Sequence, residues 1–280
     1  ITLDDVVERE YTDFFPSVSI SHTFGKDHSF SYTYSRRLNR PNYKNLNPFV
    51  EYLDQYTFQR GNAFLNPQYA DAFGINYGLG RSLFISANYS YTKDAITQVI
   101  KQFSEDNTTF QTWQNLEDQH TASLTVSVPK VWSELYTTRL SVTTFYNEFK
   151  SAIPSGTLDN RNLAHNLYLS NSFTLPQDWA LEISGNYRSK LIYALFEIDA
   201  QYGVDLGVSK SVFNGKGNLK LAVDDIFHTR DNEGRVLQDD INVKFASQWD
   251  SRRAKLSFSY NFGNQKVKAA RKRSTATEDE

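Results

Sequence analysis

The side chains best able to do chemistry are few in this chain, and their spacing does not bring them together. The five histidines stand far apart, at His22, His28, His120, His165 and His228. A metal site needs ligands that converge on one point, so we expect no metal. The chain has no cysteine, which excludes a thiolate nucleophile and a disulfide framework.

Two further motifs are explained more simply by turns than by catalysis. Asp224 and Asp225 are neighbours in "VDDIF" (223–227), and adjacent strand residues point to opposite faces, so their carboxylates cannot easily share a proton. The stretch "GLGRSLF" (78–84) lacks the lysine and the helix of a phosphate-binding loop. We therefore expect turn or rim positions at both places, no catalytic residue, no enzyme and no cofactor.

One long segment, residues 36–70, has the composition of a binding surface. Arginine and aromatic side chains dominate binding hot spots because they bury a large area at low entropy cost. The candidate ligand-binding residues that share this character are Arg37, Arg40, Tyr43, Tyr52, Tyr56 and Arg60. The alternative, which we favour, is that Pro41, Pro48 and Pro67 fold the segment back as a structured cap, since loops of this length are either functional or packed.

The elements that must position these residues are strands with one apolar and one polar face. In "SLFISANYSYT" (82–92), apolar and aromatic residues alternate with Ser and Asn, which is the period of a β-strand. The same alternation recurs in "HSFSYTYSR" (28–36), "ASLTVSV" (122–128), "LEISGNY" (181–187), "INVKFASQW" (241–249) and "KLSFSYNFG" (255–263). About a dozen such segments predict an antiparallel all-β fold.

The links between these segments alternate between short and long. Short links are expected at 25–27, 78–81, 176–178, 214–217 and 250–253, and long ones at 36–70, 150–162 and 228–238. This asymmetry is typical of a barrel with tight turns at one rim and long loops at the other.

Composition favours a membrane barrel over a soluble β-sandwich. The chain has 17 Tyr and 20 Phe, and its net charge of −2 gives no electrostatic case for a nucleic-acid partner. The polar face carries mainly small Ser, Asn and Thr, which suit a hydrated interior, whereas strands of about ten residues are long enough to cross a bilayer. We expect lipid outside and a water-filled lumen lined by Ser86, Asn88, Ser123, Thr125, Ser184, Asn186, Asn242, Gln248, Ser257 and Ser259.

Three blocks of sequence resemble a known family. The first, "YSRRLNRPNYKNLNPFVEYLDQYTFQRGNAFLNPQYADAFGINY" (34–77), joins two strands, and the others are "DLGVSKSVFNGKGNLKLAVDDIFHTR" (205–230) and "RRAKLSFSYNFGN" (252–264). Together they are similar to an outer-membrane β-barrel family related to TonB-dependent receptors of Bacteroidota-type bacteria, over residues 14–264. The resemblance implies a gated importer with a barrel of about 22 strands, plugged by an N-terminal domain.

The resemblance also implies the partners and the domain division. We expect an N-terminal linker or partial strand at 1–13, a C-terminal barrel portion of about 11–13 strands at 14–264, and a charged mobile tail at 265–280. Methionine is absent even at position 1, which favours a piece of a longer protein. The expected partners are outer-membrane lipid, a plug domain and the TonB complex, with a surface lipoprotein as a further candidate. The expected location is the bacterial outer membrane.

Other functions remain open on the sequence alone. A small outer-membrane channel or anchor protein would have the same strand pattern in its sequence. A soluble or surface β-protein that binds carbohydrate would have it too. A barrel enzyme would need a cluster of His with Ser or Asp at one rim.

Overall fold

The computed structural model describes Glu10 and residues 12–103, 108–153, 156–193, 196–237 and 243–262. Within these residues the chain is almost wholly strand, and its one helix, α1 (Tyr43–Leu46), is a single turn. No helix in the described part is both long and apolar enough to span a membrane. The expected linker at 1–13 lies mostly outside the described residues, and the expected tail at 265–280 lies entirely outside them.

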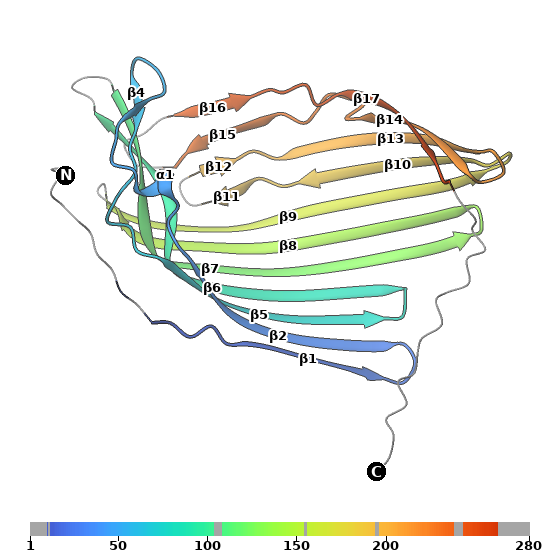
Figure 1. Cartoon of the computed structure of the whole chain (residues 1–280), viewed down its shortest axis with the longest axis horizontal. Helices are drawn as coiled ribbons and strands as arrows, with labels where there is room; N and C mark the ends of the chain where they lie inside the picture. The colour runs from blue at the N-terminus through green and yellow to red at the C-terminus, as the bar shows by residue number, and fades with distance from the viewer. Residues whose placement is uncertain are drawn as a thin grey trace, which may run out of the picture.

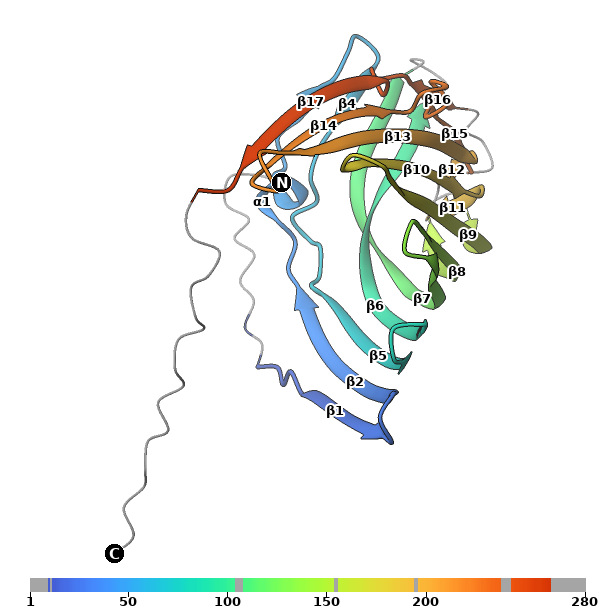
Figure 2. The ribbon, with the colours of Figure 1, turned by 90° about the vertical axis from the view of Figure 1, so that its right-hand side faces the viewer.

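Eleven strands pair side by side in one curved antiparallel sheet, called the wall here (Figure 1). In order across the sheet they are β1 (Ser17–Phe24), β2 (His28–Asn39), β5 (Gln68–Leu79), β6 (Leu83–Phe103), β7 (Thr108–Ser133), β8 (Tyr136–Ile153), β9 (Gly156–Leu175), β10 (Trp179–Arg188), β13 (Gln201–Val212), β14 (Gly217–Asp224) and β17 (Arg253–Tyr260). Figure 2 shows the wall end-on, as a wide arc whose outermost strands β1 and β17 do not meet. The predicted all-β antiparallel architecture is confirmed.

Five tight hairpins join the wall strands at one end, on the right in Figure 1. Their turns are residues 25–27, 80–82, 134–135, 176–178 and 213–216. Gly25 and Gly80 have φ of 58° and 51°, a left-handed conformation that glycine adopts without steric cost. The hairpins predicted near 25–27, 78–81, 176–178 and 214–217 are therefore confirmed. The short link predicted at 250–253 joins β16 to β17, but it lies at the opposite end of the wall from these hairpins.

The other end carries additional strands outside the wall, and we call it the long-loop end. The chain segment that connects β2 to β5 contains a two-strand ladder, β3 (Glu51–Tyr52) and β4 (Thr57–Gln59). A separate four-stranded sheet pairs β11 (Leu191–Tyr193), β12 (Phe196–Ile198), β15 (Asn232–Val236) and β16 (Lys244–Ser247). In Figure 1, the far ends of β6 and β7 turn away from the wall direction and rise beside β4 and α1.

Three sequence predictions are wrong at the long-loop end. Residues 150–162 are not a long loop, because β8 continues to Ile153 and β9 starts at Gly156. Residues 228–238 contain β15 rather than forming one irregular loop. The segment 241–249 supplies only β16 of the four-stranded sheet, so Gln248 follows that strand and does not line the wall, and Asn242 lies outside the described residues.

The hydrophobic core of the described residues lies at the long-loop end, where β6, β7 and β8 meet the four-stranded sheet. Its buried members are Ala95, Val99, Ile100, Leu116, Phe149 and Val236, with Phe196 and Val243 packed against them. These residues come from β6, β7 and β8 on one side and from the four-stranded sheet on the other. The long-loop ends of β6, β7 and β8 and the four-stranded sheet, called the accessory sheet here, therefore form one packed unit, stabilised by ordinary apolar burial.

The wall itself has a polar face and an exposed apolar face. One row of facing residues, Ser31, Asn76, Ser86 and Thr125, is wholly polar, and Ser86 Oγ donates to Asn76 Oδ1 at 2.7 Å. The adjacent row, Tyr32, Ile75, Ala87 and Leu124, is apolar or aromatic. Ile75 and Leu124 are about half exposed, at 51% and 48%. A continuous apolar belt of this size is stable against lipid and aggregates in water.

Aromatic rings follow the hairpin rim of the wall. Trp132 stacks on Tyr136 with ring centroids 6.4 Å apart, and Tyr136 stacks on Phe173 at 4.7 Å. Farther along the rim, Phe213 contacts Tyr260 edge to face at 5.8 Å. Aromatic girdles at the edges of an apolar band are typical of transmembrane barrels, where the rings lie at the headgroup level.

Candidate ligand-binding site at the long-loop end

The segment between β2 and β5, residues 40–67, is held against the extended part of β7. β4 pairs with β7 in parallel, with Phe58 opposite Phe110, and their rings lie 5.2 Å apart. The Arg60 N–H donates to the Gln111 carbonyl at 3.0 Å, and the Thr109 N–H donates to the Tyr56 carbonyl at 2.7 Å. These contacts join residues about fifty positions apart, so the segment is a folded cap.

Asn115 on β7 fixes the second half of this cap. Its Nδ2 donates to the Asn66 carbonyl at 2.9 Å and to the Asp94 carbonyl at 2.8 Å, while its Oδ1 accepts from the Asn66 N–H at 2.8 Å. Leu65, next to Asn66, is completely buried. With three hydrogen bonds to backbone groups, the Asn115 amide holds the end of the cap against β7, much as the backbone of a paired strand would.

Glycine permits the tightest crossing in the cap. The Asn62 N–H donates to the Asn45 carbonyl at 2.6 Å, and the Gly61 N–H donates to the Asn47 carbonyl at 2.8 Å. A Cβ on Gly61 would lie 2.6 Å from backbone atoms of Asn45 and Asn47, which cannot move aside as a flexible side chain would.

Two neighbouring pockets open on this cap, and both are lined by Phe49, Arg60 and Gly61. The larger has a volume of about 460 Å³ and the smaller about 310 Å³. The larger pocket is also lined by Lys44, Asn47, Val50, Glu51, Gln59 and Trp113. Phe49 is 72% exposed, so a large flat ring is available to a ligand. Concave aromatic surfaces with a few polar groups are the usual form of small-ligand sites.

Positively charged side chains outnumber carboxylates around these pockets. Arg60 Cζ lies 5.3 Å from the Phe110 ring centroid, a cation–π contact that orients the guanidinium. Glu51 Oε2 accepts from Gln59 Nε2 at 2.7 Å, so the carboxylate in the larger pocket is paired with a neutral amide. Within the described residues, neither Lys44 nor Arg60 has a carboxylate within 4.0 Å.

Of the six residues selected from the sequence, only Arg60 lines these pockets. Tyr43 lies on α1 beside Lys44, and Tyr52 and Tyr56 lie on and beyond β3, all three strongly exposed. Arg37 lies near the end of β2, facing Ala70, and Arg40 follows that strand. Phe49, Lys44 and Trp113 were missed. Phe49 could have been found from the sequence, because it ends the "LNPF" motif of the 36–70 segment. Trp113 could not, because it reaches the pocket only through the pairing of β4 with β7.

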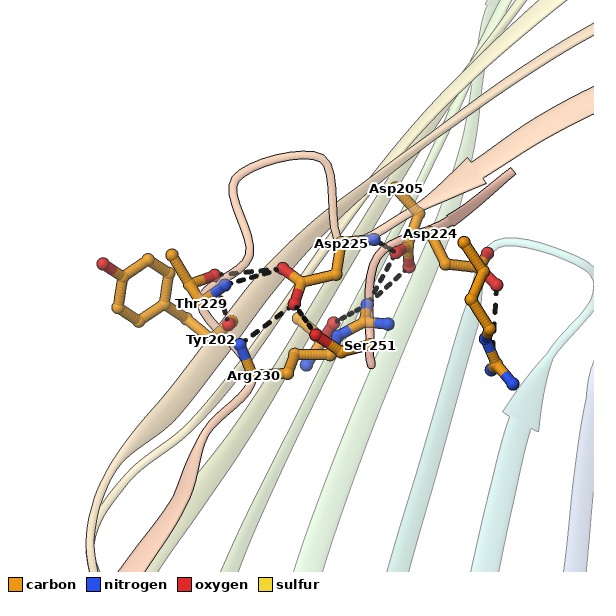
Figure 3. A network of polar contacts seen from close by, with 9 residues as sticks. Tyr202, Asp205, Asp224, Asp225, Thr229, Arg230 and Ser251 are labelled. Atoms are coloured by element: carbon orange, nitrogen blue, oxygen red, sulfur yellow. Dashed lines mark hydrogen bonds and ion pairs between the residues drawn. The ribbon is translucent and has the colours of Figure 1, made fainter. Parts of the chain in front are cut away.

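A second polar cluster fixes the connection that follows β14 (Figure 3). Asp225 is fully buried, in a left-handed conformation with φ of 47°. Its carboxylate accepts hydrogen bonds from the Thr229 N–H at 3.0 Å, the Arg230 N–H at 3.0 Å and the Ser251 hydroxyl at 2.7 Å. Burial raises the pKa of Asp225, but these hydrogen bonds outweigh burial and lower the pKa to about 2.

The same cluster reaches onto the polar face of the wall. Arg230 Nη2 lies 2.6 Å from Asp205 Oδ2 and donates to Asn186 Oδ1 at 2.8 Å (Figure 3). Asp224, the neighbour of Asp225, points elsewhere and lies 4.0 Å from Arg253. The two aspartates therefore occupy a turn and the rim, as the sequence predicted.

The histidines stay apart in the structure. His120 contacts the Tyr89 hydroxyl at 2.8 Å, and His165 contacts the Thr144 hydroxyl at 2.9 Å. Among the described residues, no three His, Asp or Glu side chains are grouped so that they could hold a metal ion.

Comparison with solved structures identifies the fold of the wall. The siderophore receptor PirA from Pseudomonas aeruginosa superposes with a TM-score of 0.58 at 12% identity, over 78% of this chain and 39% of that one. Two mutants of the ferric enterobactin receptor PfeA from the same organism, one of them in complex with enterobactin, give TM-scores of 0.51 and 0.50 at 15% and 16% identity. Each match covers 78% of this chain and 35% of the receptor, so the chain spans well under half of these receptors.

Sequence comparison identifies the family. Comparison with curated proteins gave no match. The model of the outer membrane protein beta-barrel family matches residues 1–260, which is most of the chain. The predicted resemblance and the predicted location in the bacterial outer membrane are both confirmed. The chain belongs to the outer membrane protein beta-barrel family.

Proposed function

We propose that the chain forms the wall, polar lumen and extracellular ligand face of a TonB-dependent-receptor-like importer. The observation that carries this proposal is the division of an eleven-stranded wall into an exposed apolar face and a hydrogen-bonded polar face. Lipid would cover the first face and water would fill the space beside the second.

The polar face is suited to a lumen. Ser123, Thr125, Ser184 and Asn186 lie on it, and Thr125 Oγ1 and Thr143 Oγ1 are hydrogen-bonded at 2.9 Å. Small, mutually hydrogen-bonded side chains leave space and bind a passing solute weakly, as a passage requires.

The long-loop end would face outside the cell. Short turns on the periplasmic side and longer loops on the outside are the usual orientation of outer-membrane barrels. In this orientation the cap at 40–67 holds the cargo before import. Further strands would complete the barrel at the free edges of β1 and β17, and a plug domain and the TonB complex would gate it, with a surface lipoprotein as a candidate partner.

We also propose that the chain has no catalytic activity. In support, the cap is held by backbone hydrogen bonds and ring packing, and the carboxylate of Asp225 already accepts hydrogen bonds from two backbone N–H groups and a hydroxyl. The chemistry of such an importer is binding and release.

The full-length gene product tests this proposal. Reconstituted in planar bilayers, a plugged importer should conduct little until the plug is loosened by denaturant, and it should bind the purified C-terminal domain of TonB. A protein that conducts steadily on insertion and binds no TonB is instead a small channel, and the importer proposal is then wrong.

A further inference from the structure

The polar face of the wall is uncharged in one half and charged in the other. On β1, β2, β5, β6 and β7, the residues of this face from the hairpin turns as far as Ser35, Ala72, Ser90 and Thr121 carry no charge. They are Ser, Thr, Asn, Gly and Ala together with Phe84, Pro129 and Val131, and Arg37 is the next residue of this face on β2. On β8, β10, β13, β14 and β17, the same face carries Arg139, Glu182, Arg188, Asp205, Lys220, Asp224, Arg253 and Lys255. The charged side chains that line the lumen would therefore lie on the side formed by β8 to β17.

Cations exceed carboxylates on the charged half. Each acid there has a basic neighbour: Glu182 lies 3.8 Å from Lys220, Asp224 lies 4.0 Å from Arg253, and Asp205 lies 2.6 Å from Arg230. This leaves three cations, Arg139, Arg188 and Lys255, which have no carboxylate within 4.0 Å among the described residues.

Arg188 is the cation on this half whose side chain is best placed to bind an anion. It lies on the polar face at the long-loop end of β10, opposite Gln201. Its Nη2 makes only a long contact, 3.5 Å, with the Asp199 carbonyl, and its Nε is buried without a hydrogen-bond partner. An arginine N–H left unsatisfied in this way is stabilised by an anionic oxygen.

The pockets of the cap have the same excess of positive charge. Arg60 and Lys44 line the larger pocket beside Phe49 and Trp113, and Glu51 is the one carboxylate in its lining. An exposed aromatic face next to a guanidinium fits a ligand that has both a ring and an anionic oxygen. The cap and the wall are separate elements, and both favour an anion.

We infer that the ligand is a ring-bearing anion, held first at Arg60 and Phe49 on the cap and then drawn along the cationic half of the wall. This inference rests on the proposed importer function and adds the class of cargo. A track of fixed positive charge raises the local concentration of an anionic solute and disfavours a cationic one. Two sources supply such a ligand: an oligosaccharide of uronic acids, or an iron chelate of catecholates.

Binding to the purified full-length protein in detergent tests the inference. The probes are trigalacturonate, a ferric tricatecholate and the neutral maltotriose, each titrated by calorimetry. At least one anionic probe should bind, more weakly as salt rises, and the combined Arg60→Gln and Lys44→Gln variant should raise its Kd by about tenfold. The matched control, Lys26→Gln with Arg81→Gln in the hairpin turns, should leave Kd unchanged.

The outcomes separate the alternatives. The anionic probe that binds identifies the source as glycan or chelate. Three outcomes would each overturn the inference. Maltotriose could bind as tightly as the anionic probes, neither anion could bind, or the cap variant could leave Kd unchanged.

Uptake by cells tests the wall. The Arg139→Gln and Lys255→Gln pair should slow uptake of the bound probe about threefold without changing its Kd, and unchanged uptake would overturn the role of the wall. Anion binding with no TonB-dependent uptake would reject the importer and leave the binding site standing.

Discussion

Arg230 and Asp205 form an ion pair, with Nη2 2.6 Å from Oδ2, that joins the turn after β14 to the polar face of β13. Glycine at position 203 on β13 leaves room for this pair, because a Cβ there would clash with Arg230 Nε in its present position. The connection that carries β15 and β16 is thus anchored to the wall by side chains as well as by its ends. The segment between β14 and β17 is therefore tied to the polar face of the wall at Asp205 and Asn186.

Loss of Arg230 should free this connection. Arg230→Met leaves Asp205 without its cation and Asn186 without a donor, which should destabilise the rim by about 1–3 kcal/mol. Limited proteolysis between β14 and β17 should become faster, while the β-strand content measured by circular dichroism should match that of the wild type. The control is Arg253→Gln: Arg253 is 73% exposed and 4.0 Å from Asp224, so its cleavage rate should match the wild type. Equal protection in all three proteins would contradict the anchoring role.

The pKa of Asp225 predicts a loss of stability in acid. Asp225 lies outside the wall strands, and hydrogen bonds lower its pKa from the ordinary value of 3.8 to about 2. Because the folded-state pKa is the lower one, the contribution is fully present above about pH 4 and is lost as the pH falls toward 2. Asp225→Asn should be less stable at pH 7, and the difference from the wild type should shrink between pH 4 and 2. Denaturant unfolding at pH 7, 4 and 2.5 measures this, and a difference that is constant with pH would refute it.

A methyl group at Gly61 should disrupt the cap. Gly61→Ala places a Cβ 2.6 Å from the backbone of Asn45 and Asn47, so the chain must shift by more than a rotamer change. Amide hydrogen exchange should accelerate at Gly61 and Asn62, whose N–H groups donate across this crossing. Gly185→Ala, where the nearest atom would be 3.9 Å from the new Cβ, is the control and should exchange normally. Unchanged protection in Gly61→Ala would show that the crossing is looser than described.

The wall could be predicted from the sequence because its pattern is local. Alternation with period two assigns each residue of β2, β5 or β6 to a face without knowledge of its neighbours. Turn residues such as Gly25 and Gly80 mark the hairpins in the same way. The extensions of β8 and β9 have no such local pattern. Residues 150–162 are mostly polar, and up to Ile153 and from Gly156 onward they are strand because β8 pairs with β9.

The accessory sheet and the site depend on contacts between distant residues. β12 pairs with β15 over only three residues, between Phe196–Ile198 and Gly234–Val236, which leaves no repeating pattern to detect. Arg60 was selected for its type and its loop, whereas the placement of Trp113 beside it follows from parallel pairing of β4 with β7. Gln248 was assigned to the lumen by alternation alone and lies outside the wall, because alternation does not say which sheet a strand joins.

The most direct test of the central claim is a cysteine scan of β7 in lipid bilayers, which the absence of natural cysteines makes clean. Ser123→Cys and Thr125→Cys lie on the polar face, and Leu124→Cys and Val126→Cys lie on the apolar face. The account predicts that a water-soluble maleimide labels the first pair, whereas fluorophores placed at the second pair are quenched by spin-labelled lipid. Equal maleimide labelling at all four positions, with no quenching by lipid, would contradict a wall that separates lipid from a water-filled lumen.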